Sequence, residues 1–246
     1  SRSADPRSLD PQAQFDEISG NIIQNTYDTL VEYHYLKRPY ELSPLLLESM
    51  PTRSEDGLTY SFTLKKGVFF HDDPCFAGGK GREVFADDVL FTLKRFSDIN
   101  INTQSWFLLQ GIVRGLDTYR EKSAKEKLNH LLGSVEGLVK TGTHSFDVKL
   151  TQKNNLFLYA FAASSLSVLA HEAVEKYGQD FDIHPVGTGP FILKEYEKKR
   201  TIVLVKNPRY HEVYPNEGEE NDRSKGLLSA AGKKLPLLDE VQILFI

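Results

Sequence analysis

The chain has 246 residues, of which 40% are hydrophobic and 11% aromatic, enough for a buried core in one large domain or two small ones. Its net charge of −4 argues against nucleic acid or an anionic membrane surface as the main partner. No stretch approaches the roughly 18 uninterrupted apolar residues of a membrane-spanning helix. The single cysteine, Cys75, excludes an internal disulfide and a cysteine-based zinc site. The polar opening residues carry no signal-peptide pattern, so the compartment does not follow from the residues alone.

The first predicted helix follows a turn signal at Asp10-Pro11. Apolar residues recur at helical spacing from Phe15 to Tyr33, which predicts a helix over this range with one buried face. Asp16 and Glu17 stand at its start, where negative charge complements the helix dipole.

Two hairpins are expected in the middle of the chain. Alternating apolar and polar residues at 58–64 predict a half-buried strand, and residues 68–70 are its expected antiparallel partner across a short turn. The second hairpin is predicted over residues 135–150, with Gly142 in its turn.

Between these hairpins lies a glycine-rich stretch, residues 72–84. Lys80 suggests a phosphate-binding loop, but that motif needs Ser or Thr after the lysine and Gly81 stands there, so we predict a surface loop. Asp87 and Asp88 then open a predicted helix. Metal binding or acid–base chemistry is the alternative role for this pair, but acids at a helix start usually complement the dipole.

The second half of the chain continues the mixture of helices and strands. A charged, solvated helix is expected within residues 118–130, and two more helices at 154–163 and 171–177. Residues 215–236 are polar and glycine-rich and predict an insertion loop. Residues 241–246 predict a buried strand, and the chain stops inside it without a terminating turn.

The segment His184–Phe191 holds two glycines and two prolines in eight residues. Gly187 and Gly189 permit close backbone approaches, and the prolines hold their neighbours extended. A buried strand is predicted directly after it, at 201–205. A rigid turn of this kind suits the wall of a cleft; a structural loop that caps a sheet is the alternative.

This segment, HPVGTGPF, together with KNPRYH behind the strand, resembles the ABC-transporter solute-binding proteins of family 5, the oligopeptide, dipeptide and nickel binders. Three further blocks agree with the family in the expected order: LDP with NIIQNTYDTLV, DGLTYSFTLKKGVFFHDD with FADDVLFTLKRF, and HEAVEKYGQDF. Because members of this family are longer than this chain, the resemblance implies an N-terminal lobe fragment.

The resemblance implies a mixed α/β (α+β) fold. It is one lobe of a type II periplasmic binding protein, with an inserted hairpin-and-helix subdomain and the C-terminal lobe missing. Residues 1–38 and 152–246 are expected to form lobe I, and residues 39–151 the inserted subdomain. A second lobe would close on the ligand by hinge motion.

The function that the resemblance implies is that of the substrate-binding component of an ABC importer. It would capture a peptide or similar small solute in an interlobe cleft and deliver it to a membrane permease. The expected ligand-binding residues are Phe15, Asp16, Glu17, Trp106, Gly187, Thr188 and Gly189. Each has a structural alternative: dipole complementation for the acids, core packing for the tryptophan and a conformational role for the 187–189 turn.

No enzyme, metal site or cofactor is expected, because the sequence lacks HExxH, H-x-H, an EF-hand loop and G-x-S-x-G. His71 beside Asp72 and Asp73 is the best local metal cluster, but we expect it to face water. The resemblance implies a monomer in the periplasm or outside the cell, with a lipid anchor at a missing N-terminus left open. A ligand-sensing module of related fold and, less favoured, a cleft hydrolase are the alternatives.

Overall fold

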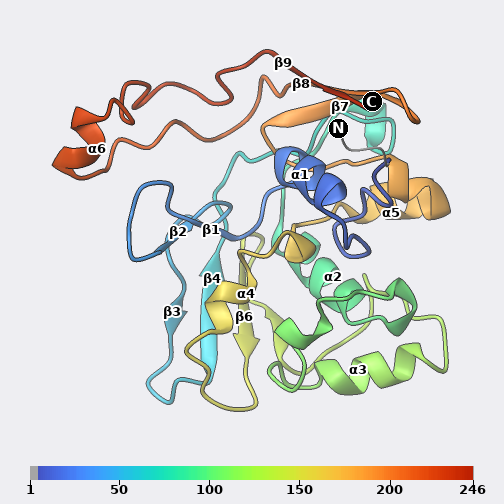
Figure 1. Cartoon of the computed structure of the whole chain (residues 1–246). Helices are drawn as coiled ribbons and strands as arrows, with labels where there is room; N and C mark the ends of the chain where they lie inside the picture. The colour runs from blue at the N-terminus through green and yellow to red at the C-terminus, as the bar shows by residue number, and fades with distance from the viewer. Residues whose placement is uncertain (1–4, 246) are drawn as a thin grey trace.

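The computed structural model describes residues 5–245 and combines antiparallel sheets with short helices (Figure 1). The helices and strands follow in this order: α1 Glu17–Thr26, β1 Val31–Tyr33, β2 Leu42–Pro44, β3 Thr52–Arg53, β4 Thr59–Thr63, α2 Ala86–Phe96, α3 Leu116–Ser123, β5 Leu138–Lys140, β6 Ser145–Lys149, α4 Phe157–Ala160, α5 His171–Tyr177, β7 Phe191–Glu197, β8 Thr201–Lys206, α6 Glu220–Ser224 and β9 Glu240–Leu244. Single 3₁₀ turns lie between several of them, among them Trp106–Leu108 and Ser164–Leu166.

The described strands pair in three separate antiparallel sheets. These are the β1–β2 pair, a four-stranded sheet in the order β3-β4-β6-β5, and a three-stranded sheet in the order β7-β8-β9. In Figure 1 the three-stranded sheet lies beside α1 and α5, and the four-stranded sheet lies below. Phe62 and Phe146 are cross-strand partners of β4 and β6, and their rings stack at 4.8 Å between centroids.

Helix α1 is shorter than the range 15–33 predicts, because the chain leaves the helix after Thr26. Tyr27 is already extended, and its hydroxyl accepts a hydrogen bond from the Val186 backbone N–H. Residues Val31–Tyr33 form β1 and pair with β2. The apolar residues that suggested a longer helix are buried, but on an extended chain, because pairing with a distant strand overrides helical periodicity.

Residues 68–70 are not the partner of β4, so that prediction is wrong. The Phe70 N–H donates to the Arg82 carbonyl and the Val84 N–H to the Val68 carbonyl, so the segment pairs with the returning end of the 72–84 loop. The place beside β4 is taken by β6, from the second predicted hairpin, which is confirmed with β5 and β6 in antiparallel register.

The C-terminal strand is half-buried where a buried one was predicted, because Val241 and Ile243 pack against the smaller core and the residues between them are exposed. Strand β9 is the edge of its sheet, its exposure alternates along the strand, and the side chain of Leu244 is largely in water. Ile246 lies outside the described residues. The predicted 215–236 loop carries α6 on an arm that extends away from the sheet (Figure 1).

Helix α1 connects two hydrophobic cores. Ile23 belongs to the main core, which gathers residues from β4, β6, α2, α4 and α5, whereas Ile22 belongs to a smaller core beneath β7 and β8. Adjacent residues of one helix thus face different cores, and α1 is held from both sides. The main core draws on both of the pieces expected from the sequence, and the division into 1–38, 152–246 and 39–151 stays a prediction.

Candidate functional site

A groove runs along the exposed side of α1. Its first part, about 500 Å³, lies between the loop at residues 14–17 and the loop at residues 104–107. Its second part, about 320 Å³, lies beyond the end of α1, and the two parts share Gln24 and Ser164. Each part falls within the range of volumes that small-ligand sites occupy.

The loop that leads into α1 is anchored by a buried ion pair. Arg95 of α2 donates to both carboxylate oxygens of Asp10, at 3.1 and 2.6 Å, and also to the side-chain oxygen of Gln12 at 2.7 Å. The Gln12 amide in turn donates to the Thr92 carbonyl at 2.8 Å. These bonds fix the backbone immediately before the groove, so the residues that follow are presented from a rigid base.

Asp16 is the N-cap of α1, and its carboxylate is engaged there. It accepts hydrogen bonds from the backbone N–H and the hydroxyl of Ser19, at 2.9 and 2.6 Å, and from the Arg7 backbone N–H. Although partial burial opposes the shift, these bonds keep the pKa of Asp16 below its usual value. Phe15 and Glu17, on either side, are exposed and line the groove.

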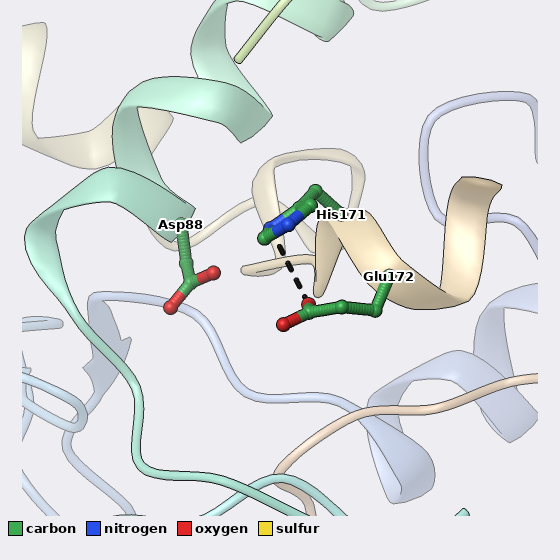
Figure 2. A group of neighbouring side chains, drawn as sticks. All are labelled: Asp88, His171 and Glu172. Carbon is green, nitrogen blue, oxygen red and sulfur yellow. Dashed lines mark ion pairs between the residues drawn. The ribbon is translucent and has the colours of Figure 1, made fainter. Parts of the chain in front are cut away.

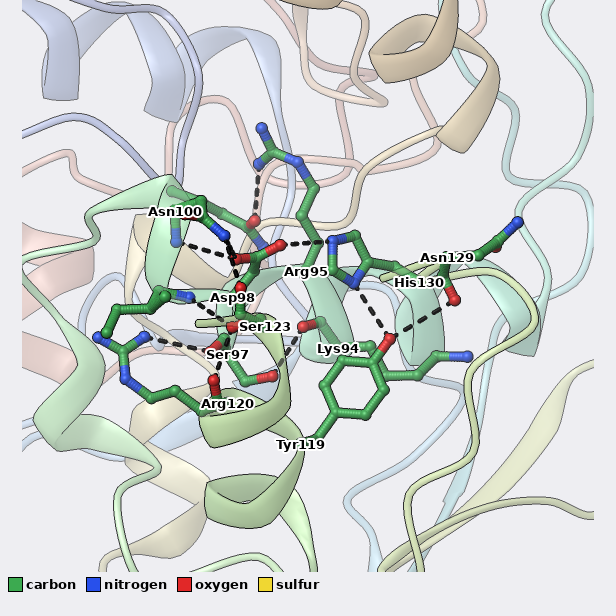
Figure 3. A network of polar contacts seen from close by, with 12 residues as sticks. Lys94, Arg95, Ser97, Asp98, Asn100, Tyr119, Arg120, Ser123, Asn129 and His130 are labelled. Carbon is green, nitrogen blue, oxygen red and sulfur yellow. Dashed lines mark hydrogen bonds and ion pairs between the residues drawn. The ribbon is translucent and has the colours of Figure 1, made fainter. Parts of the chain in front are cut away.

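The opposite wall, residues 104–107, rests on the polar network shown in Figure 3. Asp98 caps the turn that precedes this wall and pairs with His130 at 3.0 Å. Although burial opposes it, the hydrogen bonds from His130 and Asn100 lower the pKa of Asp98 to about 2. Arg120 donates to the Ser97 carbonyl at 3.1 Å, which ties α3 to the end of α2.

Trp106 is directed into this support and does not line the groove. Its ring packs on Phe96 with 6.2 Å between centroids, and the Arg120 guanidinium lies 4.8 Å from its centre. The next residue, Phe107, is 70% exposed and lines the groove. Leu108, the third residue of this short helical turn, also packs against the core.

The turn at residues 187–189 lies behind the groove. A Cβ added to Gly187 would stand 2.1 Å from the Thr26 carbonyl oxygen, so this glycine is required for close contact with the end of α1. The Thr188 hydroxyl donates to the Asp28 carboxylate at 2.8 Å. Gly189 donates its N–H to Thr26 and is itself buried. The turn therefore supports the groove through Asp28.

Asp28 lines the second part of the groove, although its side chain is only 3% exposed. Burial raises its pKa to about 7, despite hydrogen bonds from the hydroxyls of Thr188 and Tyr210. Asp28 and Tyr210 lie in the sequence blocks NIIQNTYDTLV and KNPRYH, but they were not expected as site residues, because they meet across 182 residues of chain.

His71 does not face water, which corrects the prediction. It is 2% exposed, its Nε2–H donates to the Gly189 carbonyl at 2.9 Å, and its backbone N–H donates to the Gly187 carbonyl. Burial lowers its pKa to about 4, so the ring is neutral near pH 7. His71 is a support of the 187–189 turn.

One group of side chains has the spacing of a metal site. Asp88 of α2 and His171 and Glu172 of α5 bring their ligand atoms within 4.8 Å of one another (Figure 2). The Arg82 guanidinium already occupies the space between the carboxylates, with bonds of 2.6 and 2.8 Å to Asp88 and of 2.5 and 2.8 Å to Glu172. The position of a cation is therefore filled by an arginine.

Comparison with known proteins gives a family match over most of the chain. Residues 41–246 match the model of bacterial extracellular solute-binding proteins, family 5 Middle, which confirms the resemblance seen in the sequence. The chain is 34% identical to the dipeptide-binding protein of Escherichia coli over 72% of its length. It is 31% identical to heme-binding protein A of Haemophilus influenzae over 76%. It spans about a third of these relatives, 31% and 32% of their lengths.

A solved structure shows the same fold. The ABC transporter-associated periplasmic binding protein DppA from Helicobacter pylori, in complex with the peptide STSA, superposes with a TM-score of 0.67 at 26% identity. The match covers 93% of the present chain and 44% of that one. The mixed α/β fold of a type II periplasmic binding protein is thus confirmed. Within residues 5–245, no helix has the length and apolar character needed to cross a membrane.

Proposed function

The chain belongs to the bacterial extracellular solute-binding proteins of family 5, and from this membership we propose that it binds a peptide or similar small solute for an ABC importer. The observation that carries the proposal is the groove along α1, which is open, partly apolar and built on a rigid base. The names of two similar proteins, a dipeptide-binding protein and a binding protein in complex with a peptide, support a peptide ligand.

The two sides of the groove offer complementary contacts to a peptide. Phe15 and Phe107 provide exposed aromatic surface for apolar side chains of the ligand. Gln24 and Ser164, where the two parts of the groove join, provide amide and hydroxyl groups for the peptide backbone. Glu17 lines the groove, where its carboxylate can contact a ligand ammonium group, and the carboxylate of Asp16 caps α1.

The 187–189 turn and Trp106 act on the ligand indirectly in this proposal. Thr188 holds Asp28 at the groove, and Gly187 and Gly189 allow the turn to approach α1. Trp106 holds the loop that presents Phe107. These residues position the surface that the ligand touches.

Capture followed by delivery to a membrane permease needs no bond to be broken. The ligand is held by the greater affinity of a closed state, and release follows reopening. Because the family consists of binding proteins that act outside the cytoplasm, we place the protein in the periplasm or outside the cell, as a monomer without catalytic activity.

The test is to purify the full-length protein from its native host, denature it and identify the released small molecules by mass spectrometry, followed by calorimetry with a panel of di- to pentapeptides. A peptide released at near one per protein, or binding in the micromolar range or tighter, is the expected result. A protein that is empty and gives no heat with any peptide contradicts the proposal. Release of cleaved peptides would favour a hydrolase instead.

A further inference from the structure

A second pocket, about 620 Å³ in volume, continues the groove beyond its second part. It lies between the β1–β2 pair with its connecting loop and the segment 210–217, and is closed by residues of the 215–236 arm. It shares Glu32, Tyr33 and Tyr210 with the groove. Figure 1 shows the arm extending on the same side of the molecule as the β1–β2 loop. The pocket and the second part of the groove are therefore neighbours on the surface.

Tyrosine rings form much of its wall. Tyr35 from the β1–β2 loop meets Tyr214 from the start of the arm edge to face, with 5.7 Å between ring centroids. Tyr33 of β1 lines both the pocket and the groove and is 48% exposed. Tyrosine faces carry partial negative charge and attract cations.

The charged residues of the pocket leave a negative excess. Its lining includes four glutamates, Glu32, Glu41, Glu212 and Glu217, and one lysine, Lys37. Lys37 is shared by two of the glutamates, Glu41 at 3.3 Å and Glu217 at 3.4 Å. A third, Glu212, pairs with Lys65 outside the pocket.

The carboxylate of the fourth, Glu32, has no hydrogen bond or ion pair within the described residues, and Glu32 lines both the pocket and the groove. Desolvation by the surrounding residues and repulsion from Glu212 raise its pKa to about 7, although the charge of Lys65 opposes the shift. A carboxylate without an ion pair among the described residues is stabilised by a cation that enters the pocket, in addition to the more distant charge of Lys65.

We propose that this pocket binds a positively charged side chain of the ligand, an ammonium or guanidinium group, between the Glu32 carboxylate and the faces of Tyr33, Tyr35 and Tyr214. The inference rests on the proposed function and narrows it to peptides that carry a basic residue. The arm that borders the pocket is the stretch 215–236, which the sequence predicts to be an insertion loop. The preference for a basic side chain therefore depends on a wall that this insertion helps to form.

The test uses calorimetry on the full-length protein with tetra-alanine peptides that carry one lysine at each position in turn, against the same peptides with norleucine in its place. The variant is Glu32→Gln, and the matched control is Glu121→Gln, an exposed acid on α3. We expect the best lysine peptide to bind about tenfold more tightly than its norleucine counterpart, as a charge-assisted contact predicts. That preference should disappear in Glu32→Gln and persist in Glu121→Gln.

The outcomes separate this inference from the function on which it rests. If norleucine and lysine peptides bind the natural protein equally well, the pocket is not a cation site, while the proposed function stands. A lysine preference that survives in Glu32→Gln likewise overturns the assignment. If no peptide binds, both the proposed function and this inference fail.

Discussion

The carboxylate of Asp10 accepts two hydrogen bonds from the guanidinium of Arg95, at 2.6 and 3.1 Å, and both side chains are more than nine-tenths buried. This pair joins the loop before α1 to α2. It therefore connects the 14–17 wall of the groove to the helix that precedes the 104–107 wall. A buried charge with its partner removed is costly, which makes the pair the most sensitive point of the scaffold.

Arg95→Gln should therefore lower the free energy of unfolding by about 3–5 kcal/mol, because it leaves the Asp10 carboxylate buried without a cation. Urea unfolding monitored by circular dichroism measures the change. Arg200→Gln, which removes an arginine from the exposed pair with Glu197, is the control and should leave the midpoint unchanged. Equal midpoints for the natural protein and Arg95→Gln would contradict the anchoring role.

Gly187→Ala should destabilise the protein by about 1–3 kcal/mol, because the new methyl group would overlap the Thr26 carbonyl oxygen. Gly20→Ala is a control with the opposite expected effect. Gly20 lies inside α1, where an added Cβ would make only ordinary van der Waals contact, at 3.6 Å from the Gln14 side-chain oxygen, so alanine there should stabilise the protein by about 0.5–1 kcal/mol. Thermal and urea unfolding of both variants measure these changes in the free energy of unfolding. A neutral Gly187→Ala would show that the turn does not press against α1.

Substitutions of the neighbouring residues Trp106 and Phe107 should affect different properties, the first the stability of the protein and the second its affinity for the ligand. Trp106→Ala removes a ring from the core and should cost about 2 kcal/mol of unfolding free energy. Phe107→Ala removes an exposed ring and should leave stability unchanged, while it weakens ligand binding about 5- to 30-fold, or about 1–2 kcal/mol. Calorimetry with the peptide released from the native protein, beside urea unfolding, tests both. A Trp106→Ala variant with unchanged stability and weakened binding would contradict this assignment, because it would show that Trp106 contacts the ligand.

His71 should make the protein sensitive to acid. Its pKa is about 4 when folded and near 6.5 when unfolded, so its contribution to stability is complete above pH 6.5 and is lost as the pH falls toward 4. His71→Gln should remove a pH-dependent contribution on the order of 3 kcal/mol over this range. Asp28, whose pKa is raised to about 7, acts in the opposite direction, with stability lost as the pH rises from about 4 to 7.

The difference between the natural protein and His71→Gln, measured by urea unfolding at several pH values, cancels the contribution of Asp28. Nitrogen-15 NMR of the histidine rings gives a second check, with a neutral His71 protonated on Nε2 at pH 5 as the expected state. A ring that is charged at pH 5 would disprove its burial.

Local patterns predicted those parts of the fold that local forces decide. The acidic start of α2 and the hairpin at residues 135–150 were predicted because helix caps, period-two alternation and turn glycines act over a few residues. The end of α1 was missed because β1 forms by pairing with β2 across a loop. The partner of β4 was missed for the same reason, since the paired residues of β6 lie 82 to 90 positions further along the chain, from Thr63↔Ser145 to Thr59↔Lys149.

The candidate site was predicted only in outline. Phe15 and Glu17 do line the groove, whereas Trp106 and Thr188 are directed into its supports. Composition and spacing could not distinguish a residue that touches the groove from one that holds it in place. Glu32 carried no sequence signal, because its setting depends on an arm almost two hundred residues further along the chain.

The most direct test of the account is site-specific photo-crosslinking in the full-length protein, with benzoylphenylalanine in place of Phe107 and a pooled library of short peptides. The groove along α1 predicts a peptide adduct at position 107, found by mass spectrometry. It predicts no adduct when the same group replaces Leu132, which is 80% exposed but does not line the groove. Binding of the library without any adduct at position 107, or equal labelling at both positions, would show that the ligand lies elsewhere.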